Sequence, residues 1–256
     1  MTRWLAAAYG AVVYLIFFVT FLYAIGFVGD LIVPKGIDSG TPGPLAAAVL
    51  IDVALLGLFA VQHSLMARPF FKRWWTRFVP AIVERSTYVL LSSIVLILLF
   101  WLWRPLPETI WLVAAPNAAL LLQAIFWLGW ATVLLSTFLI SHFELFGLQQ
   151  VWLGLKQRVA EPPRMRTPFL YGFVRHPLYF GFLLAFWATP HMTMGHLLFA
   201  AATTAYILIA VRLEEHDLIA IFGADYVAYR RRVSMLIPLP PRGAAKDAET
   251  PPAATT

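Results

Sequence analysis

Long apolar segments dominate the hydrophobic pattern of this chain, and polar residues gather at their ends. Four segments each approach the ~20 residues that a helix needs to cross a bilayer. They cover residues 4–28, 44–66, 86–103 and 117–140. Two shorter apolar segments, 178–188 and 196–211, follow on either side of a proline-containing turn. The pattern predicts an all-α, polytopic membrane helical bundle with five to six spans, in which the last two segments form a helical hairpin.

A short periodic segment follows the last predicted span. Phe222, Tyr226, Tyr229 and Val233 recur at the spacing of one helix face, and the basic run 230–232 lies on or beside the opposite face. This spacing predicts a C-terminal cytoplasmic amphipathic helix. Two interpretations stay open: a helix lying on an anionic lipid surface, or an aromatic lid over the hairpin.

The composition supports a membrane protein. Hydrophobic residues make up 61% of the 256 residues and charged residues only 12%, whereas soluble domains carry about 25% charged residues. The chain contains no cysteine, which excludes disulfides, thiolate metal sites and a cysteine nucleophile. The sequence implies no metal site.

The basic residues are distributed very unevenly between the two sides of the predicted bundle. Of the 19 Lys and Arg residues, all but Lys35 and Arg104 fall on one side of an alternating topology. The positive-inside rule places this side, together with both termini, in the cytoplasm, so we expect an integral protein of the inner (cytoplasmic) membrane. This placement accounts for the net charge of +6 without nucleic acid as a partner.

The chain reads as one transmembrane domain, residues 1–238. We divide it into an N-terminal bundle, 1–141, and a C-terminal half, 142–238. Residues 239–256 are rich in Pro, Ala and Thr, and we predict a disordered tail there. The sequence gives no indication of the oligomeric state.

Ionisable residues cluster at the cytoplasmic ends of the predicted spans. The candidates are His142 and Glu144 after the fourth span, Arg175 and His176 before the fifth, and Glu214 and Glu215 after the sixth. The positive-inside rule does not require carboxylates at this depth, and burying them requires partners. Since both ends of a hairpin lie at the same membrane face, these groups form a candidate site.

Two further polar residues lie inside the second span. Asp52 and His63 are eleven positions apart, which places them on nearly the same helix face. An intramembrane acidic residue is a functional candidate, but we favour a structural hydrogen bond to a neighbouring span. Neither a glycine-rich dinucleotide fingerprint nor a P-loop is present.

The order of motifs in the C-terminal half resembles a known group of enzymes. The motifs are Arg175-His176-Pro177-x-Tyr179, the apolar hairpin, Glu214-Glu215, Phe222-Gly223-x-Asp225-Tyr226-x-x-Tyr229 and Ile237-Pro238. Together they resemble the membrane methyltransferases related to isoprenylcysteine carboxyl methyltransferase. Residues 141–153 and 182–190 are similar to the bacterial methanethiol S-methyltransferases, and the related NnrU proteins share the general pattern.

The resemblance implies S-adenosylmethionine as methyl donor and methanethiol, a small volatile thiol that can arrive from the lipid bilayer, as acceptor. The products would be dimethyl sulfide and S-adenosylhomocysteine. The implied cofactor-binding residues are Arg175, His176 and Tyr179 at the start of the fifth span, Glu214 and Glu215 at the end of the sixth, and Tyr226 and Tyr229 as the cover.

These residue types suit that donor. Arg175 can pair with its carboxylate, a glutamate can accept hydrogen bonds from its ribose or ammonium group, and tyrosine faces attract its sulfonium. A thiol of cysteine type has a pKa of ~8.5, so help with deprotonation is expected. Our hypothesis assigns this catalytic role to His142, acting with Glu144.

Other functions also agree with the pattern. The acceptor could be a different lipophilic thiol or a carboxylate. Alternatively, the bundle could be a transporter, a quinone carrier, or a haem carrier with His63 and His142 as axial ligands. A non-catalytic NnrU-like protein is the third alternative. Binding of S-adenosylmethionine separates the methyltransferases from the other two.

Overall fold

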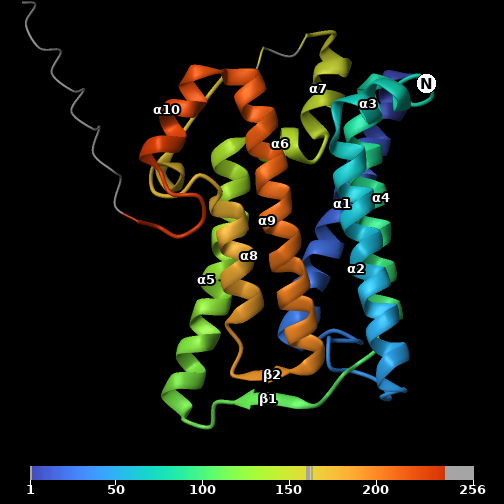
Figure 1. Cartoon of the computed structure of the whole chain (residues 1–256). Coiled ribbons are helices and arrows are strands. Elements are labelled where there is room, and N and C mark those ends of the chain that lie inside the picture. Colours follow the sequence, from blue (N-terminus) through green and yellow to red (C-terminus); the bar gives the residue numbers. More distant parts are fainter. Residues whose placement is uncertain (1, 160–161, 163, 240–256) are drawn as a thin grey trace, which may run out of the picture.

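A computed structural model of the chain describes residues 2–159, 162 and 164–239. Among these, five helices are long and apolar enough to cross a membrane. They are α1 (Arg3–Gly29), α2 (Leu45–Ala67), α4 (Ala81–Leu102), α5 (Pro116–Ile140) and α9 (Met194–Phe222). A shorter apolar helix, α8 (Pro177–Trp187), lies beside α5 and α9 (Figure 1). The predicted membrane helical bundle is confirmed, with five long helices and one short one.

The remaining elements lie at the two ends of the bundle (Figure 1). At the end that carries the N-terminus lie α3 (Pro69–Trp75), α6 (His142–Leu145), α7 (Leu148–Lys156), the 3-10 helix Phe169–Gly172 and α10 (Ala224–Arg232). At the opposite end, β1 (Thr109–Leu112) and β2 (His191–Thr193) pair antiparallel. The predicted tail falls, from residue 240 on, outside the described residues.

The hairpin differs from its prediction in the length of its second helix. Helix α8 matches the predicted segment 178–188 closely, but α9 continues beyond Val211 through the twin glutamates to Phe222. Charged residues end an apolar run without ending a helix, since Glu and Arg are good helix formers. Glu215 therefore lies roughly 10 Å below the end of α9, given the rise of 1.5 Å per residue. The site is set into the bundle.

Two glycines fix the position of α8 against α5. A Cβ atom added to Gly181 would lie 2.7 Å from the carbonyl oxygen of Gly129 and 2.8 Å from the amide nitrogen of Val133. Such close backbone approach at small residues is typical of helix pairs in membranes. Because Arg175 and His176 directly precede α8, this packing also positions the candidate site.

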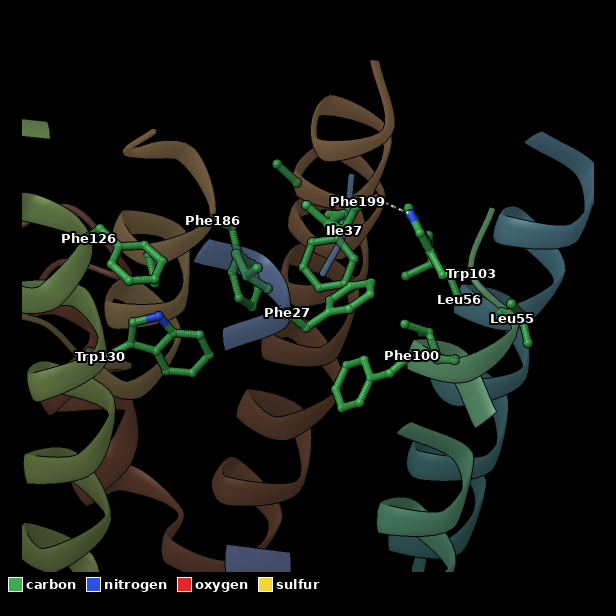
Figure 2. Close-up of a cluster of buried hydrophobic side chains, with 14 of the residues drawn as sticks. Phe27, Ile37, Leu55, Leu56, Phe100, Trp103, Phe126, Trp130, Phe186 and Phe199 are labelled. Atoms are coloured by element: carbon green, nitrogen blue, oxygen red, sulfur yellow. Dashed lines mark hydrogen bonds between the residues drawn. The ribbon is translucent and has the colours of Figure 1, made fainter. Parts of the chain in front are cut away.

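The aromatic core occupies the half of the bundle near the β-strands. Figure 2 shows Phe27 of α1, Phe100 of α4, Trp103 directly after α4 and Phe199 of α9 among the buried side chains. Trp103 and Phe199 pack edge to face with ring centroids 5.9 Å apart. This half is tightly filled with apolar groups, so the opposite half carries most of the polar chemistry.

Asp52 belongs to the same half of the bundle, near the β-strands, and has a structural role there. It is fully buried, and its Oδ1 accepts a hydrogen bond of 2.9 Å from the backbone amide of Arg104, directly after α4. This contact agrees with the structural interpretation favoured from the sequence.

Candidate active site

The two ends of the hairpin meet at a buried ion cluster. The Nε of Arg175 donates a hydrogen bond of 2.6 Å to Oε1 of Glu215, and the Nε2 of His176 lies 3.2 Å from the same oxygen. His176 is buried and both Arg175 and Glu215 side chains are about 10% exposed. Charge-assisted hydrogen bonds of this kind are short and strong. The cluster brings together residues that are 40 positions apart in sequence.

The neighbouring glutamate has a different environment. The side chain of Glu214 is 44% exposed, against 10% for Glu215, and its Oε2 lies 3.8 Å from Nδ1 of His176. The hydroxyl of Tyr179 also interacts with Glu214. Glu215 is thus committed to internal partners, whereas Glu214 keeps a carboxylate oxygen available to a ligand.

The end of the described chain folds back over the cluster. The backbone amides of Arg175 and His176 donate to the carbonyls of Ser234 (2.8 Å) and Met235 (3.2 Å). The Nη1 of Arg175 donates to the carbonyls of Arg230 and Val233, which ties α10 to the start of α8. These bonds agree with the interpretation of α10 as a lid.

Two tyrosines of α10 face inward beneath this lid. The hydroxyl of Tyr229 donates a hydrogen bond of 2.6 Å to the carbonyl of Tyr171, and burial raises the pKa of Tyr229 to about 12. The hydroxyl of Tyr226 is buried and has no hydrogen-bond partner among the residues that the structure describes, and burial raises its pKa as well. Both phenols therefore stay neutral at physiological pH. A buried hydroxyl without a partner is unusual and suits a ligand contact.

His142 lies in a separate aromatic environment at the end of α5. Its Nδ1 lies 2.8 Å from Oγ1 of Thr137, whose hydroxyl donates to the carbonyl of Leu134 (2.7 Å). Thr137 must therefore accept a hydrogen from Nδ1, which leaves Nε2 to accept from the hydroxyl of Tyr14 at 2.8 Å. Burial lowers the pKa of His142. In this arrangement Tyr14 caps the basic nitrogen of the ring.

The structure does not join the two predicted catalytic residues to the cluster. All contacts described for His142 are with α1, with α5 and with the segment 143–146. Glu144 is exposed on α6. Within the described part of the chain, seven predicted cofactor-binding residues therefore share one region, while the catalytic role of His142 and Glu144 stays a prediction.

Several polar residues near the cluster were missed or set aside at the sequence level. Tyr88 and Tyr206 lie inside predicted spans, and their hydroxyls contact His63 (2.9 Å) and Ser64 (3.1 Å). The sequence could have indicated these residues, because hydroxyl and imidazole groups within apolar segments require polar partners in a membrane. Only the packing of α2, α4 and α9 reveals which groups meet.

Two hollows on the molecular surface lie elsewhere. One, of about 630 Å³, lies beside α7 and includes Phe143 and Trp152 in its lining; the other, of about 680 Å³, lies between α1 and α4. Neither is lined by a residue of the cluster, and the lining of both is mainly apolar. The cluster is a candidate active site because several buried ionisable groups meet there.

The fold and this cluster define a helical integral membrane protein with a covered polar site near one end of the bundle. The chain is 56% identical to the methanethiol S-methyltransferase of Mycobacterium tuberculosis over 94% of this chain and 99% of that protein. It is 58% identical to methanethiol S-methyltransferase 1 of Bradyrhizobium diazoefficiens, over 92% of this chain and 83% of that protein. The chain therefore belongs to the methanethiol S-methyltransferase family.

A more distant similarity extends to animals. Nurim of Bos taurus is 34% identical over 71% of this chain and 76% of that protein. No family model and no solved structure matches the chain. The family assignment therefore comes from the bacterial relatives, and it agrees with the resemblance inferred from the motifs.

Proposed function

We propose that this protein transfers a methyl group from S-adenosylmethionine to methanethiol, forming dimethyl sulfide and S-adenosylhomocysteine. The names of the bacterial relatives support the reaction and the acceptor. The observation that carries the site is the meeting of Arg175 and His176 with Glu214 and Glu215 beneath α10. The asymmetry of basic residues supports a site that opens to the cytoplasm, where this donor is made.

The residues present fit such a donor. Arg175 uses Nε and Nη1 for internal bonds, while Nη2 has no described partner and can bind a carboxylate. The half-exposed Glu214 can accept from ribose hydroxyls or an ammonium group. Tyr226 offers a buried hydroxyl that lacks a partner within the described chain. Each of these groups is a polar atom that a ligand can satisfy.

The donor, when bound, supplies an electrophilic methyl group on a positively charged sulfur. The faces of Tyr226 and Tyr229 attract cations, and burial keeps both rings neutral. Opposite reactant charges are neutralised as a thiolate attacks, so a site that excludes water favours the reaction. The lid and the ion cluster would therefore mainly align the two reactants and exclude water from the site.

Matched histidine variants test this proposal. We expect purified protein to bind S-adenosylmethionine in calorimetry and to release dimethyl sulfide from methanethiol, detected in the headspace. His176→Gln should weaken donor binding about 10-fold or more, because it removes a buried partner of two carboxylates. His216→Gln is the control, since the side chain of His216 is 84% exposed.

The outcomes separate the parts of the proposal. Folded wild-type protein that does not bind the donor would contradict a methyltransferase. Donor binding without dimethyl sulfide formation would instead assign another lipophilic thiol or a carboxylate as the acceptor. Equal donor affinities for the two histidine variants would show that the cluster is not part of the donor site.

A further inference from the structure

A second polar network crosses the inner half of the bundle between α2, α4 and α9. Tyr88 of α4 places its hydroxyl 2.9 Å from Nε2 of His63 on α2, and the hydroxyl of Ser92 lies 3.3 Å from Nδ1 of the same ring. One turn of α2 is also linked to α9, because Ser64 and Tyr206 share a hydrogen bond of 3.1 Å. Polar side chains within spans are costly unless they are paired, and they often mark substrate paths.

This network reaches the donor cluster through Tyr179. The hydroxyl of Tyr179 interacts with Glu214 and lies within electrostatic range of both Tyr206 and Tyr88. Tyr179 of α8 thus links the donor cluster electrostatically to the tyrosines of α9 and α4 that contact Ser64 and His63. A small molecule bound among them would lie between the donor cluster and a histidine.

Neighbouring side chains hold the ring of His63 in place. The ring stacks on Phe59 with centroids 5.1 Å apart, and the hydroxyl of Tyr88 lies 2.9 Å from Nε2 and 3.0 Å from Nδ1, so these two neighbours restrict its orientation. His63 nevertheless keeps accessible surface, whereas Tyr88 is buried. The imidazole is therefore oriented by α4, and the residue as a whole is partly buried.

We propose that His63 accepts the proton of the thiol substrate, which binds beside it between α2, α4, α8 and α9. This inference rests on the methyl transfer proposed above. The S–H bond of the thiol breaks and its proton goes to an imidazole nitrogen of His63. The sulfur lone pair forms the new bond to the methyl group, the bond from that methyl to the donor sulfonium breaks, and its electron pair stays on the donor sulfur. The imidazolium then releases its proton to water.

His63 fits this role better than His142. The ring nitrogens of His142 contact Tyr14 and Thr137, and no contact within the described residues joins His142 to the cluster. His63 is linked to Tyr88, which in turn lies near Tyr179. The geometry thus favours His63 as the base, whereas the sequence analysis assigned that role to His142, acting with Glu144.

A pH–rate profile at saturating S-adenosylmethionine tests the proposal. We expect His63→Gln to lower kcat for methanethiol by at least about 100-fold at pH 7, as general-base catalysis contributes 10²–10⁴-fold. The deficit should shrink as the pH approaches the pKa of the thiol, because the thiolate then forms without help. Donor affinity should stay at the wild-type value, unlike that of His176→Gln.

The charged and titratable groups around His63, which also bear on its pH dependence, are Arg85 and Tyr88 of α4, Tyr206 of α9 and Arg68 of α2.

Two further variants keep the test decisive. His142→Gln is measured beside His63→Gln, with His216→Gln as the exposed control. Tyr88→Phe removes the orienting hydroxyl and should lower kcat about 10-fold with an unchanged KM for the donor, which also gives a result if His63→Gln does not fold. A wild-type rate and pH profile in His63→Gln would overturn the proposal. If His63→Gln does not fold, the same result in Tyr88→Phe would overturn it. A loss of activity confined to His142→Gln would overturn it as well. Failure of the wild-type protein itself to methylate methanethiol would instead refute the proposed function.

Discussion

Glu215 shows how one residue organises the candidate site. Its carboxylate lies 2.6 Å from Arg175, 3.2 Å from His176 and 3.6 Å from Arg230, so it compensates three cationic or polar partners from two segments. Both glutamates were identified from the sequence, but their separate roles were not. Consecutive helix residues point about 100° apart, and only packing decides which one faces inward. The sequence could therefore locate the pair but not tell which glutamate is buried and which is exposed.

Tyr229 provides a test of the lid at the same scale. Tyr229→Phe removes the hydrogen bond to the carbonyl of Tyr171, which should cost about 1 kcal/mol of lid closure. We expect donor affinity to fall about 5-fold with little change in kcat, measured by calorimetry and initial rates. Tyr9→Phe is the control, because Tyr9 bonds Thr87 on a different pair of helices. An unchanged affinity in Tyr229→Phe would argue that α10 does not cover the donor.

The raised pKa of Tyr229 also predicts how the contribution of this residue changes with pH. Burial raises this pKa to about 12, above the usual value of ~10, so the fold favours the neutral phenol. The stabilisation from this group is therefore fully present below pH ~10 and is lost as the pH rises towards 12. The difference between wild type and Tyr229→Phe should stay constant from pH 6 to 9.

At the scale of elements, the hairpin was predictable but its packing was not. The apolar pattern located α8 within a residue at each end, because a proline begins it and Thr189–Pro190 follows it. The contact between Gly129 and Gly181 was not foreseen, since a glycine inside an apolar run does not reveal which helix approaches it. The length of α9 was underestimated because its last turns are polar while still helical.

Matched glycine substitutions test how tightly α8 is held. Gly181→Ala places a Cβ against backbone atoms of Gly129 and Val133, which cannot move as easily as a side chain. We expect a loss of about 1–3 kcal/mol in stability, seen as a lower midpoint of thermal unfolding in detergent. Gly57→Ala on α2 meets no atom within 4 Å and should be neutral or stabilising by up to about 1 kcal/mol. Equal midpoints for the two variants would show that α5 and α8 can separate at little cost.

At the scale of the whole molecule, the two ends of the bundle differ in character. One end is closed by β1 and β2 above an aromatic core, and the other carries the short helices, the ion cluster and most of the basic residues (Figure 1). The sequence predicted this polarity from the distribution of Lys and Arg. It could not predict the strands, because segments of three and four residues show no usable periodicity and their pairing depends on how the helices bring them together.

The orientation of this asymmetric molecule can be tested directly, because the chain has no cysteine of its own. Thr41→Cys places a thiol in the exposed loop before α2, at the end with the β-strands, and Thr76→Cys places one after α3, at the end with the cluster. By the positive-inside rule, a membrane-impermeant maleimide added to spheroplasts should label only Thr41→Cys, and both variants should react after lysis. The reverse pattern would place the cluster of Arg175 and Glu215 on the outer face. A charged donor made in the cytoplasm could not reach the cluster there, so this single labelling pattern decides whether the proposed donor has access to its site.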